Sequence, residues 1–231
     1  MNPHCPPDPS ANRPAMAIDP AGWLAGAARR PSPHCDDRPD GAPIDLLVIH
    51  NISLPPGEFG GGAIDDLFLG RLDPAAHPWF AIAAAAGPVS THLLIRRDGH
   101  LIQYVPCRRR AWHAGRSSFD GRARCNDFSI GIELEGTDTE PFAPVQYEVL
   151  ARCTRVILDC YPAITAERIA GHSDIAPGRK TDPGPCFDWQ RYRELLRTEQ
   201  SGAARRSGLD HRCGRPGPES KASALDLSGQ G

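Results

Sequence analysis

Three side chains that could act on a substrate or bind a metal occur within a short stretch of this sequence. They are His172, Lys180 and Asp182, in the segment Ala170–Trp189, which reads A-G-H-S-D-I-A-P-G-R-K-T-D-P-G-P-C-F-D-W. Its three prolines fix their own φ angles and bias the preceding residues towards extended geometry. We therefore expect a stiff loop, a common carrier of functional groups on a protein scaffold.

A metal site built on this loop needs a ligand from elsewhere, because His172 and Asp182 are ten positions apart and cannot pair along one helical turn. His50 follows an apolar run at 44–49 that has the length and composition of a buried strand. Two imidazoles and one carboxylate form a three-ligand zinc set whose fourth position is open to water, as catalysis requires. The alternative is a closed structural site, for which Cys186 is the nearest fourth ligand.

A fifth candidate, Glu133, lies in the alternating segment 129–135, S-I-G-I-E-L-E. Ile130, Ile132 and Leu134 share one face, so Glu133 lies on the other. The strongly apolar face indicates a central strand, where a buried carboxylate is costly unless it serves a purpose. In the alternative arrangement this is an edge strand and Glu133 and Glu135 face solvent.

These residues need a scaffold, and the hydrophobic patterns predict one domain at 41–200 with an α/β (α+β) fold, a mixed central β-sheet covered by helices. The Asp98-Gly99 pair predicts a type I′ hairpin. Proline-rich composition at 1–40 and Gly/Ser/Arg-rich composition at 201–231 predict flexible tails. The expected strands are 44–49, 91–97, 100–105 and 129–135, and the expected helices are 63–69, 77–85, 144–160 and 188–197.

Composition narrows the class of protein. A formal net charge of −2 argues against nucleic acid as a partner. Arginines at 108–110, 122 and 124 are expected to form local basic pockets for a small anion. The sequence shows neither a signal-peptide pattern nor an apolar run near 18 residues, and its eight cysteines include no C-x-x-C pair. We therefore expect a cytoplasmic protein with reduced thiols and no membrane partner.

Several runs in order resemble the zinc-dependent N-acetylmuramoyl-L-alanine amidases of the Amidase_2 and peptidoglycan-recognition superfamily. The resemblance covers about residues 45–193 and is closer to the branch that acts on 1,6-anhydro-muropeptides in cell-wall recycling. Several sequence segments that occur in the family's order identify a family more specifically than any single ligand motif. They are V-I-H-N-I-S-L-P-P-G-E-F-G-G, L-I-R-R-D-G, Q-Y-V-P, R-A-W-H-A-G, C-N-D-F-S-I-G-I-E-L-E-G-T-D-T and D-I-A-P-G-R-K-T-D-P-G-P.

The resemblance implies a role for individual residues. It implies one Zn²⁺ per chain, a water-activating acid and a lysine near the metal. It also implies contacts to an anhydro-muropeptide substrate, and we expect the protein to be a monomer. The family's metal ligands fall on His50, His172 and Asp182, its catalytic residues on Glu133 and Lys180, and its substrate contacts on Asn51, Trp112 and Arg124.

One position departs from the family pattern. An arginine that the related enzymes can carry before the V-S-x-H run is Pro88 here, so one substrate-anchoring contact is in doubt. Two alternative functions also remain open. One is an amidase acting on intact peptidoglycan, and the other is a non-catalytic muropeptide sensor, although such binders lose metal ligands and this chain has all three.

Overall fold

A six-stranded mixed sheet forms the centre of the protein, in a computed structural model that describes residues 16–207. The strand order is β1-β5-β4-β9-β3-β10. Neighbouring strands are parallel except β4 and β5. This confirms the expected fold class. The strands are β1 (Ala28–Arg29), β3 (Leu46–Ile52), β4 (Leu93–Ile95), β5 (Leu101–Gln103), β9 (Ser129–Glu135) and β10 (Ile169–Gly171).

The strand with strict alternation, β9, is central in the sheet, between β4 and β3. All seven of its residues are buried. Ile130, Ile132 and Leu134 point into the larger hydrophobic core. Glu133 and Glu135 are 8% and 1% exposed on the opposite face. The prediction of a central strand is confirmed, and the edge-strand alternative is wrong.

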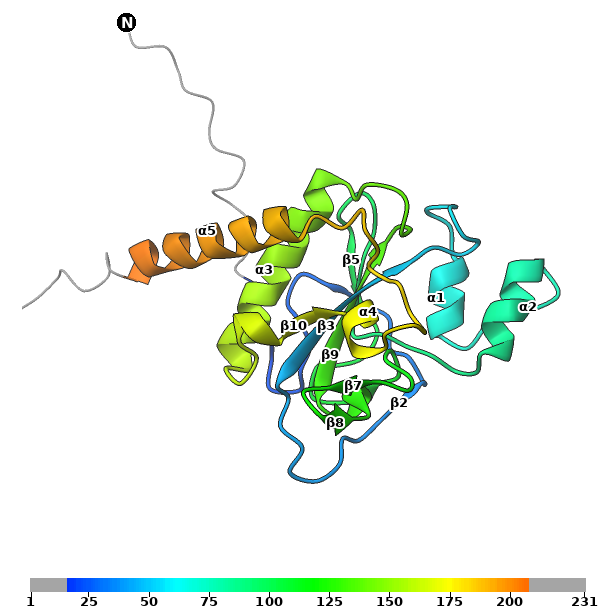
Figure 1. Ribbon diagram of the computed structural model, residues 1–231, viewed down its shortest axis with the longest axis horizontal. Helices are drawn as coiled ribbons and strands as arrows, with labels where there is room; N and C mark the ends of the chain where they lie inside the picture. The colour runs from blue at the N-terminus through cyan, green and yellow to red at the C-terminus, as the bar shows by residue number, and fades with distance from the viewer. Residues whose placement is uncertain (1–15, 208–231) are drawn as a thin grey trace, which may run out of the picture.

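Two long helices cover one side of the sheet. Helix α3 (Pro144–Cys160) has the predicted limits, with Pro144 in its first turn. Helix α5 (Trp189–Ser207) packs against α3 and is longer than the predicted 188–197. It projects from the domain at the end opposite α1 and α2 (Figure 1). None of the helices within residues 16–207 has both the length and the apolar character needed to cross a membrane.

Shorter elements lie on the other face or at the sheet edges. Helix α1 (Ala63–Phe68) packs on Leu94 and Ile102, whereas α2 (Pro78–Ala85) buries none of its residues and leaves Trp79 and Ile82 exposed. The remaining elements are β2 (Cys35–Asp36), β6 (Arg110–Ala111), β7 (Ser118–Phe119), β8 (Arg122–Ala123), α4 (His172–Ile175) and the 3-10 turns η1 (Cys125–Asp127) and η2 (Ala166–Arg168).

The turn joining β4 and β5 differs from the prediction. The hairpin is present, but only Gly99 has a positive φ angle, +82°, whereas a type I′ turn needs two such residues. The N–H of Gly99 bonds to the carbonyl of Arg96, and the N–H of Arg96 bonds to the carbonyl of His100. This is a three-residue connection with a left-handed glycine, and it still joins antiparallel strands.

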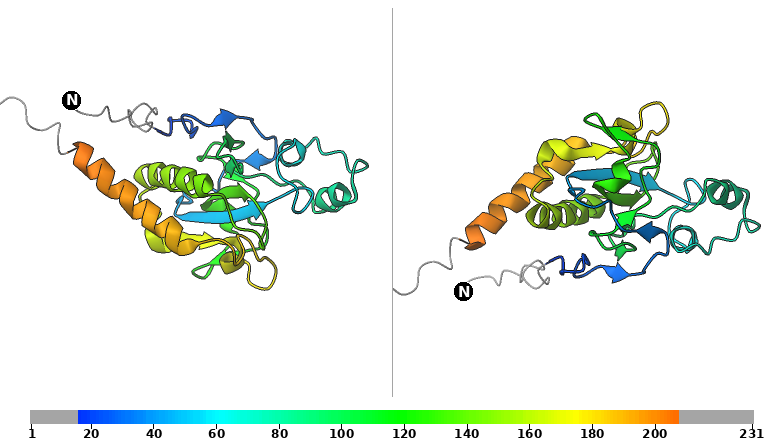
Figure 2. Two further views of the ribbon diagram at one scale, coloured as in Figure 1. Left: turned by 90° about the horizontal axis from the view of Figure 1, so that it is seen from above. Right: turned by 90° about the horizontal axis from the view of Figure 1, so that it is seen from below.

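The predicted flexible tail at 1–40 is wrong for residues 16–40, while residues 1–15 lie outside the described part. Strand β1 pairs with β5, and β2 pairs with β6. The guanidinium of Arg38 donates to the carbonyls of Cys107 and Ser129. Prolines do not prevent such short edge pairings, and Figure 2 shows this segment in blue along the outside of the domain. At the other end, α5 runs to Ser207, and residues 208–231 lie outside the described part.

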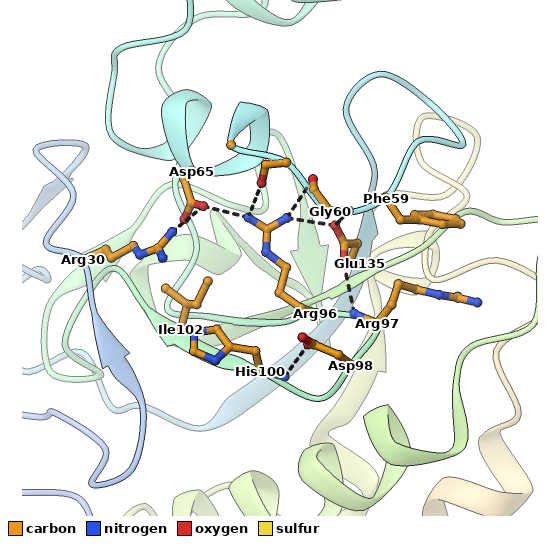
Figure 3. A pocket seen from close by; sticks show the side chains of 12 residues that line it. Arg30, Phe59, Gly60, Asp65, Arg96, Arg97, Asp98, His100, Ile102 and Glu135 are labelled. Carbon is orange, nitrogen blue, oxygen red and sulfur yellow. Dashed lines mark hydrogen bonds and ion pairs between the residues drawn. The ribbon is translucent and has the colours of Figure 1, made fainter.

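A buried charge cluster fixes the loop that follows β3. Arg96 lies between two carboxylates, donating to Asp65 at 2.7 Å and to Glu135 at 2.8 Å (Figure 3). Glu135 also accepts the N–H of Gly60 at 2.7 Å. Arg30 pairs with Asp65 from the N-terminal segment. The glycine-rich loop is therefore tied to the carboxyl end of β9.

Candidate active and metal-binding site

Two adjacent parallel strands deliver the two candidate histidine ligands to the same place. Gly171 of β10 is in register with Ile49 of β3, so the next residues, His172 and His50, lie side by side. The third ligand comes from the loop after α4. The carbonyl of Asp182 accepts the N–H of Ser173 at 2.9 Å, which holds this loop against α4.

The three predicted ligands converge. His50 Nδ1, His172 Nδ1 and Asp182 Oδ2 are each 3.0 Å from the other two. Both imidazoles are buried, and the Asp182 side chain is 14% exposed. Burial lowers the pKa of His50 to about 4, so its imidazole is neutral.

The hydrogen bond made by Nε2 of His50 shows which of its two ring nitrogens carries the proton. Ser129 Oγ donates to the carbonyl of Cys125 at 2.6 Å, so its contact with His113 Nε2 at 3.1 Å is donated by the imidazole. Burial, above all, holds the pKa of His113 well below its ordinary value, so its Nδ1 carries a lone pair. His50 Nε2, 2.9 Å away, donates to that lone pair. His50 Nδ1 is left unprotonated.

The second imidazole has the same arrangement. His172 Nε2 lies 3.1 Å from the carbonyl of Ala114 and donates to it, and Arg179 donates to the same oxygen at 2.7 Å. If this imidazole is neutral, its Nδ1 therefore also presents a lone pair.

With both imidazoles neutral, three lone pairs face one another with no proton between them, which is repulsive unless a cation lies among them. Ligands at about 2.0–2.1 Å from a tetrahedral zinc lie about 3.3 Å apart, close to the 3.0 Å found here. The donor set of two imidazoles and one carboxylate suits zinc. The residues fit a metal ion, and these three form a possible metal site.

Glu133 lies beside this site. It is in register with His50 on the neighbouring strand, so both side chains are on the same face of the sheet. Its Oε2 atom is buried without a hydrogen-bond partner among residues 16–207. Burial, and next the charge of Asp182, raise the pKa of Glu133 well above its ordinary value, and the charge of Lys180 opposes them. An unpartnered buried carboxylate is the kind of group that catalysis uses.

Lys180 and Asn51 line an open cleft of about 620 Å³ together with Asp182. Lys180 is exposed at this cleft. Asn51 donates to Asp138 at 2.7 Å and to the carbonyl of Pro183 at 3.0 Å, so its amide N–H groups hold the Asp182 loop. Residues 137–140 also line the cleft.

Two predicted substrate contacts do not line this cleft. Trp112 stacks on His34 with ring centroids 5.9 Å apart and donates to Asp36 at 3.1 Å. Arg124 pairs with Asp127 at 3.0 Å and has a side chain that is 71% exposed. The structure brings the three candidate ligands, Glu133, Lys180 and Asn51 together, whereas Trp112 and Arg124 make these contacts elsewhere.

Two of the arginines expected to form basic pockets are neutralised instead. They pair with acids that lie far away in the sequence: Arg110 with Asp36 and Asp127, and Arg122 with Asp45. These neutralised arginines act as cross-links between segments, which charge counting along the sequence could not show.

Sequence analysis missed the residues behind the ligands. The sequence patterns assign no role to His113, Asn126 or Ser129. All three lie in the runs R-A-W-H-A-G and C-N-D-F-S that carry the family resemblance. Their place in these runs was the available signal that they have a function. The sequence does not show the hydrogen bonds that they make in the folded chain.

The chain matches the model of the family Amidase_2, N-acetylmuramoyl-L-alanine amidase, over residues 40–185. It is 63% identical over 178 residues to the 1,6-anhydro-N-acetylmuramyl-L-alanine amidase AmpD of Escherichia coli (strain K12), covering 77% of this chain and 96% of that protein. It is 62% identical over 181 residues to the AmpD of Citrobacter freundii, with 78% and 95% covered.

Solved structures agree. A crystal structure of a selenomethionine derivative of AmpD superposes with a TM-score of 0.75 at 61% identity, covering 78% of this chain and 99% of that one. The solution structure of Citrobacter freundii AmpD gives a TM-score of 0.58 at 60% identity, with 80% and 97% covered. The chain therefore belongs to the N-acetylmuramoyl-L-alanine amidase family, and it is an amide-hydrolysing enzyme.

Proposed function

We propose that this enzyme uses zinc to hydrolyse the amide bond between 1,6-anhydro-N-acetylmuramic acid and L-alanine in muropeptides. The convergence of three lone pairs beside the unpartnered carboxylate of Glu133 carries the proposal. The names of the similar AmpD proteins support the choice of substrate.

His50, His172 and Asp182 would hold the zinc ion. When bound, zinc acts as a Lewis acid that lowers the pKa of a coordinated water towards about 7 and polarises a carbonyl group. The protein contributes the orientation of each ligand, since hydrogen bonds outside the site fix the outer nitrogen of both imidazoles.

Glu133 is proposed as the general base. Its ionised carboxylate accepts a proton from the attacking water and returns it to the nitrogen of the departing L-alanine. Burial makes this carboxylate a stronger base than an exposed one, because it raises the pKa. The positive charge of Lys180 opposes this rise of the pKa.

Lys180 is proposed to stabilise the negative charge that develops on the carbonyl oxygen. The chain contains two lysines, at 180 and 221, among many arginines. A compact ammonium acts as a point charge, whereas a guanidinium favours planar paired acceptors. The influence of Lys180 on the pKa values of both His50 and Glu133 supports its placement near the metal site.

Asn51, Trp112 and Arg124 remain proposed substrate contacts. Asn51 is supported by its place in the cleft. Trp112 and Arg124 would contact only a substrate that extends beyond the cleft. Pro88, in the exposed segment after α2, would offer no charge to bind the substrate. The proposal also places the enzyme in the cytoplasm as a monomer, which cell fractionation and light scattering would test.

The decisive experiment is mass spectrometry of anhydro-muropeptide incubated with the purified protein at equimolar Zn²⁺. We expect free stem peptide and anhydro-N-acetylmuramic acid from the wild type, and intact substrate with Glu133→Ala and Asp182→Ala. Substrate that binds but stays intact with the wild type would make the protein a muropeptide sensor. Parallel incubation with intact peptidoglycan separates the recycling enzyme from a wall-degrading amidase, because the proposal predicts faster release from the soluble fragment.

A further inference from the structure

One short segment accepts hydrogen bonds from both metal-binding imidazoles. His50 Nε2 donates to the Nδ1 atom of His113 at 2.9 Å, and His172 Nε2 donates to the carbonyl of Ala114 at 3.1 Å. These acceptors are on consecutive residues after β6. The orientation of two ligands on two different strands therefore depends on one piece of backbone.

The two backbone N–H groups of that segment bond to one side chain. Asn126 Oδ1 accepts the N–H of His113 at 3.1 Å and the N–H of Ala114 at 2.8 Å. The imidazole of His113 is fixed at its far end by Ser129, whose hydroxyl proton is committed to the carbonyl of Cys125. The hydroxyl bond of Ser129 fixes which nitrogen of His113 is protonated, and His113 in turn fixes which nitrogen of His50 is protonated.

We propose that His113 is a positioning residue for the metal site, and that Asn126 and Ser129 hold it in place. His113 keeps the proton of His50 on Nε2 and its lone pair on Nδ1, facing His172 and Asp182. The inference rests on the metal site of the proposed function and adds three residues to it. His113 would not contact the metal, since its Nδ1 accepts from His50 and its Nε2 donates to Ser129.

Removal of this acceptor leaves a buried N–H of His50 without a partner. The imidazole then gains by moving its proton to Nδ1 or by rotating, and both changes take a lone pair away from the metal. Loss of such outer hydrogen bonds typically weakens metal binding about 10- to 100-fold.

The test measures Zn²⁺ affinity of the metal-free protein by competition with a chromogenic chelator, without substrate. His113→Leu removes the acceptor and should weaken binding about 10- to 100-fold. His113→Asn places an amide oxygen near the former Nδ1 position and should recover most of that loss. Tyr192→Phe is the control, because it removes a buried hydrogen bond to Thr154 far from the site and should leave the zinc affinity unchanged.

A second pair of variants covers the case in which His113→Leu does not fold. Asn126→Ala frees the segment and should weaken zinc binding, while Asn126→Asp keeps an oxygen acceptor and should bind more tightly than the alanine variant. Folded His113→Leu or Asn126→Ala proteins that bind zinc within twofold of the wild type would overturn the positioning role alone. A wild-type protein that fails to bind zinc would overturn the proposed metal site as well.

Discussion

A Cβ atom on Gly131 would lie 2.6 Å from Cγ of His113, closer than real Cβ contacts come. Gly131 is in the extended strand β9, where alanine fits the backbone, so the requirement for glycine is the space that the imidazole fills. We expect Gly131→Ala to displace the ring of His113 and weaken zinc binding about tenfold, at the lower end of the effect of losing an outer hydrogen bond.

Gly136→Ala is the matched control for that substitution. Its Cβ would collide with the ring of Phe142, in the hydrophobic core rather than at the site. Both variants should lower the free energy of unfolding by overpacking, typically by about 1–3 kcal/mol. Only Gly131→Ala should change the zinc affinity measured by chelator competition, and equal affinities would show that His113 tolerates the shift.

Glu133→Gln keeps the shape of the side chain and removes its ability to accept a proton. General acid–base groups typically contribute about 10²- to 10⁴-fold, so kcat on anhydro-muropeptide should fall by this range with zinc content unchanged. The stability at neutral pH should not fall, because burial disfavours the charged form of Glu133. Product release followed by mass spectrometry checks the rate, and a loss below tenfold would remove Glu133 from the base role.

Lys180→Ala should lower kcat about 10²- to 10³-fold, the usual effect of removing one oxyanion-stabilising group. Lys180→Arg should retain part of the rate, because the charge stays but its shape changes. Arg116→Ala serves as the control, since it removes an exposed cation whose side chain lies at a different cavity. A solvated lysine without a role would give the same rate as this control.

Local patterns in the sequence predicted the scaffold well where periodicity is strong. The alternation in 129–135 identified a buried central strand, and the apolar spacing in 144–160 gave both ends of α3. The three proposed metal ligands could be selected because two histidines and an aspartate, placed after a strand and in a stiff loop, have few other roles together. Their convergence at 3.0 Å agrees with that selection.

Contacts between distant segments could not be predicted in this way. β1 and β10 are too short to show periodicity, and they become strands only because β5 and β3 offer unpaired edges. The same holds for the hydrogen bond between His113 and His50, 63 positions apart. Sequence spacing carries no information about such pairs, whereas the fold brings them together.

Removing one partner from the charge cluster around Arg96 should strongly lower the free energy of unfolding. Asp65→Asn leaves Arg96 and Arg30 facing a neutral group, and loss of one partner of a buried ion pair typically costs about 3–5 kcal/mol. Urea denaturation measures the loss. Asp159→Asn breaks the partly exposed pair with Arg155 and should cost less than about 0.5 kcal/mol.

The metal-free protein should lose stability in acid because of its buried histidines. Burial lowers the pKa of His92 to about 3 in the folded state, from about 6.5 when unfolded. Between these values the unfolded chain binds the extra proton, so the stability is fully present above pH 6.5 and is lost as the pH falls towards 3. One such group contributes a slope of up to about 1.4 kcal/mol per pH unit.

His92→Gln tests this assignment, since glutamine can still donate to the carbonyl of Arg109, the acceptor that His92 Nε2 uses at 3.1 Å. The variant should be less stable than the wild type at pH 7, but its free energy of unfolding should fall less between pH 7 and pH 5. Chemical denaturation at both pH values gives the difference, and Tyr192→Phe should retain the wild-type dependence because it removes no histidine. An unchanged pH dependence in His92→Gln would mean that His92 also binds a proton in the folded protein between pH 7 and pH 5. Its contacts with Gly131 and Arg109 would then need a different placement of protons.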